Sequence, residues 1–213
     1  CKGSFITFLD ADDLWLPSRL EEQIKFMKLN KQYKIIYTNY YVLKNDKKYL
    51  FKSYLPEGYI TQRLLDRYDL GISTVMLKRE LFVKNFFSKK LNIIGDFDFF
   101  INLSLKQEIG CIQKPLSIYR KHSSNFSIKN SQLHINEISE WILHNKKNNK
   151  KFKNYSLKGQ ILYLQSLKIK EYFRQNKKHL ILGEILKAPI NFKKIKYIIY
   201  IFLPRVIVNK YLI

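Results

Sequence analysis

Hydrophobic and polar positions along the chain follow two different periods, one typical of strands and one typical of helices. Phe5 to Leu9 is a short, nearly continuous apolar run rich in β-branched and aromatic residues, which predicts a strand buried on both faces. Residues 34–43 (KIIYTNYYVL) predict a second strand, followed by a turn at 45–47 and a hairpin partner at 48–52. Residues 72–77 (ISTVML) predict a further strand.

The segments between these strands have helical spacing. Pro17 fits the first position of a helix, and Leu20, Ile24 and Met27 then recur on one side of it. We expect this apolar side to pack on the sheet. Shorter helices are expected at 60–68 and 78–85.

The last third of the chain has a different character. Residues 131–187 are polar and helical in pattern, with a basic break at 146–153 (KKNNKKFK). Residues 192–213 alternate apolar stretches with basic residues, and are too short and too interrupted at Pro204 to span a bilayer comfortably. A basic, aromatic helix lying in the plane of an anionic lipid surface fits this pattern, and a helix packed back on the N-terminal part is the alternative.

Charge narrows the range of partners. Lys and Arg total 39 against 17 Asp and Glu, a net charge of +22, and 14 of these excess positive charges fall in residues 126–213. Such an excess is typical of proteins that bind nucleic acid, anionic lipid or phosphorylated substrates. A coding bias toward Lys, Asn, Ile, Tyr and Phe would explain it without any partner. The two cysteines form no metal or disulfide motif, and no signal peptide is visible, so a reducing compartment is expected.

Three acidic residues directly follow the first predicted strand. If the chain is still extended there, Asp10 and Asp12 point the same way and Ala11 points the opposite way. Two oxygen ligands so placed suit one hard divalent cation, which would also bind the phosphates of a diphosphate-bearing substrate. The alternative is a solvated turn or a helix cap, with Asp13 only turning the chain toward the next helix.

Two further segments carry candidate chemistry. Asp96 follows Gly95 near the expected N-terminus of a helix, where it could act in proton transfer or only cap the helix. A strand from Pro115 runs into a polar loop that holds Arg120 and His122. A lone histidine in a loop is usually just solvated.

The stretch FLDADDLWLPSRLEEQIKFM (residues 8–27) resembles the centre of the family 2 glycosyltransferases. The resemblance implies the GT-A fold, a Rossmann-like mixed sheet with flanking helices, and a nucleoside-diphosphate sugar as donor. It also implies that Asp12 of the D-x-D motif is the main ligand of a Mg²⁺ or Mn²⁺ ion. Asp10 would contact the nucleotide ribose or the metal.

The same resemblance gives roles to the other two segments. The family has a Glu-Asp pair ahead of a helix, and its Asp is the general base, which here corresponds to Asp96. Gly95 stands where the family has Glu, so Asp98 is a second candidate for the base. In the family a Tyr-Arg-x-His segment closes over the diphosphate, so Arg120 would offset phosphate charge and His122 would complete the metal site.

These expectations define a complete hypothesis. Residues 1–128 would be the metal and acceptor half of a GT-A domain that lacks its N-terminal nucleotide-binding strands and helices, and 129–213 a basic helical extension. We expect inverting transfer of a sugar to a hydroxyl of a bacterial surface glycan or lipid-linked precursor. The protein would be cytoplasmic, and peripheral on the inner face of the plasma membrane.

Three alternatives stay open at this point. A basic nucleic-acid-binding module would explain the charge, but its Lys residues are scattered and no recognisable motif is present. The acids at a strand exit would also repel phosphate unless a metal intervened. A metal-dependent nuclease or phosphatase would normally need more acidic or histidine ligands than this chain has. An inert remnant of a glycosyltransferase would share all three segments and lack activity.

Overall fold

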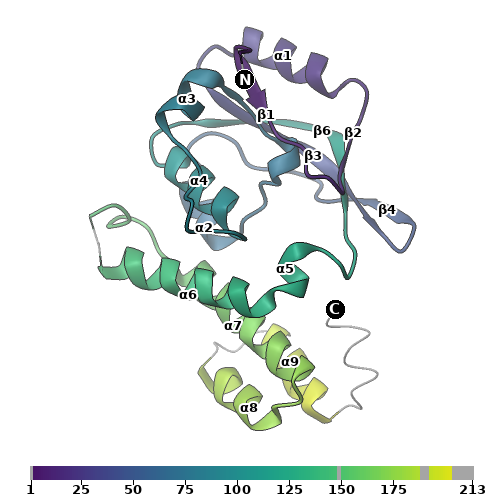
Figure 1. Ribbon diagram of the computed structural model, residues 1–213, viewed down its shortest axis with the longest axis vertical. Helices are drawn as coiled ribbons and strands as arrows, with labels where there is room; N and C mark the ends of the chain where they lie inside the picture. The colour runs from purple at the N-terminus through teal and green to yellow at the C-terminus, as the bar shows by residue number, and fades with distance from the viewer. Residues whose placement is uncertain (1, 148–149, 188–191, 203–213) are drawn as a thin grey trace. The chain divides into compact units, whose positions relative to one another are not determined.

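The computed structural model describes residues 2–147, 150–187 and 192–202 (Figure 1). The chain divides into two compact units, Cys1–Asn125 and Phe126–Ile213, and each is described by itself. The first unit has an α/β architecture with a mixed sheet and flanking helices, which confirms the predicted fold class. The regular secondary structure among the described residues of the second unit is helical.

A six-stranded sheet organises the first unit, in the order β1-β5-β3-β6-β2, with β4 paired to β3 outside this path. The parallel pair at its centre joins two long strands, β3 (Ile35–Lys44) and β6 (Ile109–Arg120). All other pairs are antiparallel. The remaining strands are short: β1 (Phe5–Thr7), β2 (Leu14–Trp15), β4 (Lys47–Leu50) and β5 (Met76–Lys78).

Helices cover both faces of this sheet (Figure 1). Helix α1 (Arg19–Leu29) covers one face, where Met27 packs with Ile36 and Met76. Helices α2 (Thr61–Asp66) and α4 (Gly95–Ser104) lie on the other face, and α3 (Arg79–Lys84) follows β5. Phe97 and Phe100 of α4 are buried, and Phe100 packs edge to face on Phe8.

The buried face of α1 differs from the expected apolar side. Leu20 is exposed, whereas Arg19 and Gln23 are fully buried and Met27 nearly so. Arg19 Nη2 donates to Thr7 Oγ1 at 2.7 Å and to the carbonyl of Val75, and Gln23 Nε2 donates to the carbonyl of Thr74. The helix therefore meets the sheet edge through hydrogen bonds as well as apolar contact, which hydrophobic periodicity does not reveal.

Two predicted strands are shorter than expected. The run from Phe5 forms strand only as far as Thr7, and its residues are half-buried because β1 lies at one end of the described sheet. Residues 72–77 divide into a 3₁₀ turn, η1 (Ile72–Thr74), and the start of β5. The turn leaves the backbone carbonyl of Ser73 free to accept hydrogen bonds from side chains of neighbouring segments.

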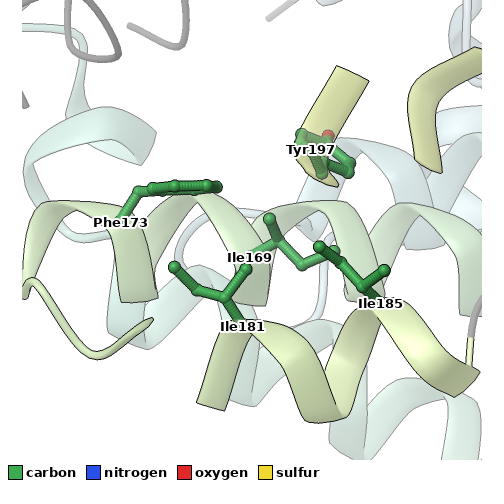
Figure 2. Packing of buried hydrophobic residues seen from close by; sticks show 5 residues of the cluster. All are labelled: Ile169, Phe173, Ile181, Ile185 and Tyr197. Carbon is green, nitrogen blue, oxygen red and sulfur yellow. The ribbon is translucent and has the colours of Figure 1, made fainter. Parts of the chain in front are cut away.

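The second unit is built from helices α5 (Phe126–Lys129), α6 (Ser131–Lys147), α7 (Lys158–Arg174), α8 (Lys178–Lys187) and α9 (Phe192–Phe202). The predicted basic break separates α6 from α7. Figure 2 shows the core in which α7, α8 and α9 meet, with Ile169, Phe173, Ile181, Ile185 and Tyr197 in contact. Ser166 and Tyr197 also join α7 to α9 through a hydroxyl hydrogen bond of 2.7 Å.

None of the helices within the described residues is long and apolar enough to cross a membrane. The last part of the expected in-plane helix, from Leu203 to Ile213, lies outside the described residues.

Candidate functional site

The acids after β1 lie in a tight turn. The backbone N–H of Asp13 donates to the carbonyl of Asp10 at 3.1 Å, which closes the turn between them. The expectation of an extended chain with Asp10 and Asp12 on one face is therefore wrong. The turn instead gives the three carboxylates different solvent exposure: Asp10 is exposed, Asp12 is half-exposed and Asp13 is buried.

Asp12 contacts the polar loop that follows β6, more than a hundred residues away in sequence. Its Oδ2 lies 3.0 Å from His122 Nε2 and accepts a hydrogen bond of 2.9 Å from Asn125 Nδ2. Asn125 Oδ1 in turn accepts the backbone N–H of His122 at 2.9 Å, so the amide fixes the loop as well as the carboxylate. The structure thus brings together Asp12 and His122, two of the predicted site residues.

Strand pairing explains this meeting. Strand β2 follows the acid turn and pairs antiparallel with the end of β6, with Leu14 opposite Ile118 and Trp15 opposite Ser117. The acid turn therefore lies beside the last residues of β6. The register between β3 and β6 shifts on both sides of the pair Asn39–Pro115, and β6 then continues to Arg120.

Asp13 is bound to the same strand end. Its Oδ1 accepts the backbone N–H of Arg120 at 3.0 Å, and its carboxylate also shares a hydrogen bond with the side chain of Ser73. Burial raises the pKa of Asp13, and these two hydrogen bonds partly oppose the rise. The side chain of Arg120 is exposed, and its positive charge lowers the pKa of Asp13 slightly.

Asp96 lies in the first turn of α4, as predicted, and is partly buried. Burial raises the pKa of its carboxyl to about 6, and the negative charge of Asp10 adds to the rise. A hydrogen bond of 3.3 Å from the hydroxyl of the partly buried Tyr68 acts in the opposite direction. The charges of Asp10 and Asp96 therefore interact, and Asp96 titrates near the pH at which a general base works best.

Asp98, the second candidate for the base, lies two residues further along α4, in the same first turn. It accepts a hydrogen bond of 3.1 Å from Asn102 in the same helix. The charge that raises the pKa of Asp96 comes from Asp10, which connects Asp96 rather than Asp98 with the acid turn. We therefore keep Asp96 as the candidate base.

Three residues near these groups were not among the predicted site residues. Asn125 holds Asp12 and His122, Ser73 joins the acid turn to η1, and Tyr68 holds Asp96. Asn125 is close to His122 in sequence, so the loop composition could have suggested it. Ser73 and Tyr68 lie in segments that carry no motif, and only the fold brings them to the site.

The residues also allow a test of the predicted metal site. Among the residues that the structure describes, no three His, Cys, Asp or Glu side chains are arranged to hold a metal ion. Asp12 and His122, which lie 3.0 Å apart, offer one carboxylate and one imidazole, and Asp10 stands at the start of the same turn as Asp12. Such a donor set fits a hard cation that takes few protein ligands and keeps positions for phosphate oxygens and water.

Comparison with known proteins finds similarity to glycosyltransferases. The sequence model of the family "Glycosyl transferase family 2" matches residues 1–124. An uncharacterized glycosyltransferase of Rickettsia bellii is 32% identical over 149 residues, which cover 67% of this chain and 21% of that protein. The chain WfgD of Escherichia coli, named UDP-Glc:alpha-D-GlcNAc-diphosphoundecaprenol beta-1,3-glucosyltransferase, is 37% identical over 79 residues, which cover 37% of this chain and 30% of WfgD.

One solved structure with a similar course of the chain is TarS 1-349 of S. aureus in complex with UDP. It matches with a TM-score of 0.47 and 16% identity, over 89% of this chain and 52% of TarS 1-349. The chain thus spans about a fifth of the length of the Rickettsia relative and about a third of WfgD.

Proposed function

We propose, from the premise that this chain belongs to glycosyl transferase family 2, that it takes part in transfer of a sugar from a nucleoside diphosphate to an acceptor hydroxyl. Residues 1–128 would carry the metal and acceptor half of the catalytic domain, and 129–213 a helical extension. The observation that carries the proposal is the meeting of Asp12 with His122 and Asn125 beside the acid turn.

Asp12 and His122, with Asp10 beside them, would hold Mg²⁺ or Mn²⁺ together with the donor diphosphate. When bound, the cation supplies positive charge that offsets the negative charge developing on the departing diphosphate. Arg120 is exposed at the end of β6, next to this group, and its guanidinium suits bidentate contact with a phosphate. Asn125 would keep the carboxylate of Asp12 in place by its hydrogen bond.

Asp96 would act as general base in a single displacement that inverts the anomeric centre. The acceptor hydroxyl oxygen attacks the anomeric carbon, the bond from that carbon to the diphosphate oxygen breaks, and Asp96 accepts the hydroxyl proton. A carboxyl with a pKa of about 6 is largely ionised at pH 7.5 and still more basic than an ordinary aspartate. The partly buried position of Asp96 supplies this basicity.

A transfer assay with UDP-sugars and a diphosphate-linked GlcNAc acceptor tests the proposal on the natural protein. Asp96→Asn should retain UDP binding and lose roughly 10²–10⁴-fold in the transfer rate, since the proton acceptor is gone. Asp98→Asn is the matched control and should remain within about threefold of the wild type, less than 1 kcal/mol in barrier. A loss in Asp98→Asn with normal transfer by Asp96→Asn would reverse the assignment of the base.

The name of one relative and the charge of the second unit support the proposed acceptor and location. WfgD is named for a diphosphoundecaprenol acceptor, and a lipid-linked acceptor of this kind would be met at the inner face of the plasma membrane. The net charge of +14 in residues 126–213 favours an anionic lipid surface. Exposed apolar side chains in the same unit, with Leu186 78% and Phe202 81% exposed, would add to the attraction.

Vesicle flotation distinguishes this lipid surface from the nucleic-acid alternative. The protein should float with anionic vesicles at low salt and not with neutral vesicles, because the attraction is electrostatic in large part. Binding to random DNA of comparable strength and salt dependence would instead favour the nucleic-acid module.

A further inference from the structure

Asp13 has no part in the proposed chemistry, although it stands next to Asp12. It is 7% exposed, and its carboxylate is directed at the backbone N–H of Arg120 and the side chain of Ser73. Arg120 is the last residue of β6, two residues before His122. Asp13 therefore connects the acid turn to the strand that leads into the histidine loop.

Ser73 is the second fixed point of the acid turn. Its Oγ accepts the backbone N–H of Asp10 at 3.1 Å, and its carbonyl accepts Trp15 Nε1 and Ser117 Oγ, each at 3.1 Å. Ser73 is 3% exposed and lies in η1, the turn that replaces the start of a predicted strand. One residue thus binds the beginning of the acid turn, the strand after it and the neighbouring strand β6.

We propose that Asp13 is a positioning residue: its buried carboxylate joins the acid turn to Ser73 and to the end of β6, and so holds Asp12 against His122 and Asn125. Two side chains then hold the acid turn in place. The Asp13 side chain fixes the end of β6 to the turn, and the Ser73 hydroxyl fixes the turn to η1. Asp12, between them, needs only a small displacement to lose its contacts of 2.9 and 3.0 Å with Asn125 and His122.

Substitutions of Asp13 can distinguish a positioning role from direct binding of a metal, because the two roles need different chemical groups. The backbone N–H of Arg120 needs only an acceptor, and the amide oxygen of an asparagine supplies one as well as a carboxylate does. The amide nitrogen of that asparagine can donate to the Ser73 hydroxyl, which accepts as well as donates. Asparagine at position 13 therefore keeps the connection without the charge, whereas alanine removes it and leaves a buried N–H unpaired.

A ligand of a cation behaves differently, since an amide is a much poorer partner for Mg²⁺ or Mn²⁺ than a carboxylate. The two neighbouring aspartates should accordingly respond in opposite ways to the same substitution. Asp12→Asn should lose the metal-supported part of UDP binding. Asp13→Asn should keep it, and Asp13→Ala should lose it in part through displacement of Asp12.

The indole N–H of Trp15 provides a readout that needs no ligand. It donates to the carbonyl of Ser73, so its hydrogen exchange, observed by ¹H–¹⁵N NMR, reports whether the segment after the acid turn remains fixed to η1. The chain has two tryptophans, and Trp141 in the second unit is an internal reference in every spectrum. The variant Trp141→Phe assigns the two signals.

The experiment compares Asp13→Ala and Asp13→Asn with Asp66→Ala, an exposed aspartate on α2, as the matched control. In Asp13→Ala the Trp15 indole should exchange about tenfold faster, the equivalent of one lost hydrogen bond. In Asp13→Asn and Asp66→Ala it should exchange as in the wild type. Equal exchange in Asp13→Ala and the wild type, or equally fast exchange in both Asp13 variants, would overturn the proposal.

Calorimetry of UDP with Mn²⁺ completes the test and rests on the proposed function. Asp13→Ala should bind about tenfold more weakly than the wild type, and Asp13→Asn within about threefold of it. Equal losses in both variants would show that the charge of Asp13 acts directly, against a positioning role. If the wild type itself fails to bind UDP, the proposed function fails, while the indole exchange still decides the role of Asp13.

Discussion

At the scale of single residues, the site separates carboxylates of one type by their surroundings. Asp12 remains half-exposed between His122 and Asn125, whereas Asp13, one residue later, is buried under the end of β6. Burial raises the pKa of Asp96, and the negative charge of Asp10 raises it further. Position in the fold, and not residue type, gives each of these acids its chemistry.

The pH dependence of transfer should follow the ionisation of Asp96. As the proposed base acts only when deprotonated, activity should rise with pH through about 6. Tyr68→Phe removes the hydroxyl that lowers the pKa of Asp96. The rising limb of the pH–activity profile should therefore move to higher pH in this variant. Tyr59→Phe, at a side chain that is 75% exposed, is the control and should leave the profile unchanged. A limb that stays in place or moves to lower pH in Tyr68→Phe would contradict the role of this hydrogen bond.

The same pKa shift predicts a cost in stability. A carboxyl whose folded pKa is raised favours the folded state when it is protonated, and that contribution is lost as the pH rises through about 6. At pH 7.5 the free energy of unfolding of Asp96→Asn should therefore exceed that of the wild type by on the order of 1 kcal/mol, and its unfolding temperature should be higher. The difference should shrink toward pH 4, and thermal denaturation at both pH values measures it. A variant less stable than the wild type at pH 7.5 would refute this.

At the scale of elements, sequence patterns located most strands and helices of the first unit. The strand at 34–43 and the helix beginning near Asp96 occur close to the predicted positions, because long apolar runs and helix starts have strong local signals. The buried side of α1 could be predicted only in part: Met27 and Ile24 pack on the sheet as expected, but Leu20 is exposed. Arg19 and Gln23 are buried through hydrogen bonds to β1 and to the residues before β5. These partners lie 12 to 56 residues away in sequence, so local periodicity does not reveal them.

The candidate site shows the same limit. Asp12, His122 and Asp96 could be predicted from their residue types and from resemblance to a family. The turn at Asp10 and the roles of Asp13 and Ser73 could not, because they depend on the pairing of β2 with β6.

The hairpin between β3 and β4 offers a test of local backbone chemistry. Asn45 and Asp46 have φ angles of 48° and 60°, the left-handed values that a two-residue hairpin turn requires at both positions. Asp46→Gly should raise the free energy of unfolding by roughly 0.5 kcal/mol, because glycine adopts this conformation without a steric cost. Asp46→Val should lower it by about 1 kcal/mol or more, because a β-branched residue is strained there. Chemical denaturation gives both values, and a stabilised Val variant would contradict this reading of the turn.

At the scale of the whole molecule, the candidate site lies entirely within the unit Cys1–Asn125, and a separate core stabilises the unit Phe126–Ile213. Ile181 is fully buried in that second core, among residues of α7, α8 and α9 (Figure 2). The positive charge is greatest in this unit as well. The candidate site and the proposed membrane attachment therefore belong to different parts of the chain.

Ile181→Ala should destabilise the second unit by about 2–5 kcal/mol, the usual cost of such a cavity. Metal-supported UDP binding should change less than about twofold, since no residue of the candidate site lies in that core. Leu143→Ala, at an exposed position of α6, is the control for stability. A parallel loss of UDP affinity in Ile181→Ala would show that the two units depend on each other.

The most direct test of the central claim is calorimetric titration of UDP into the protein, with Mn²⁺ and with the metal chelated, for the wild type and Asp12→Asn. If Asp12 and His122 form part of a donor site, Mn²⁺ should strengthen UDP binding by the wild type by at least about tenfold, or 1.4 kcal/mol. Asp12→Asn should bind UDP equally weakly in both conditions. Equal affinity of the wild type with and without the metal, or a full metal effect in Asp12→Asn, would contradict the account.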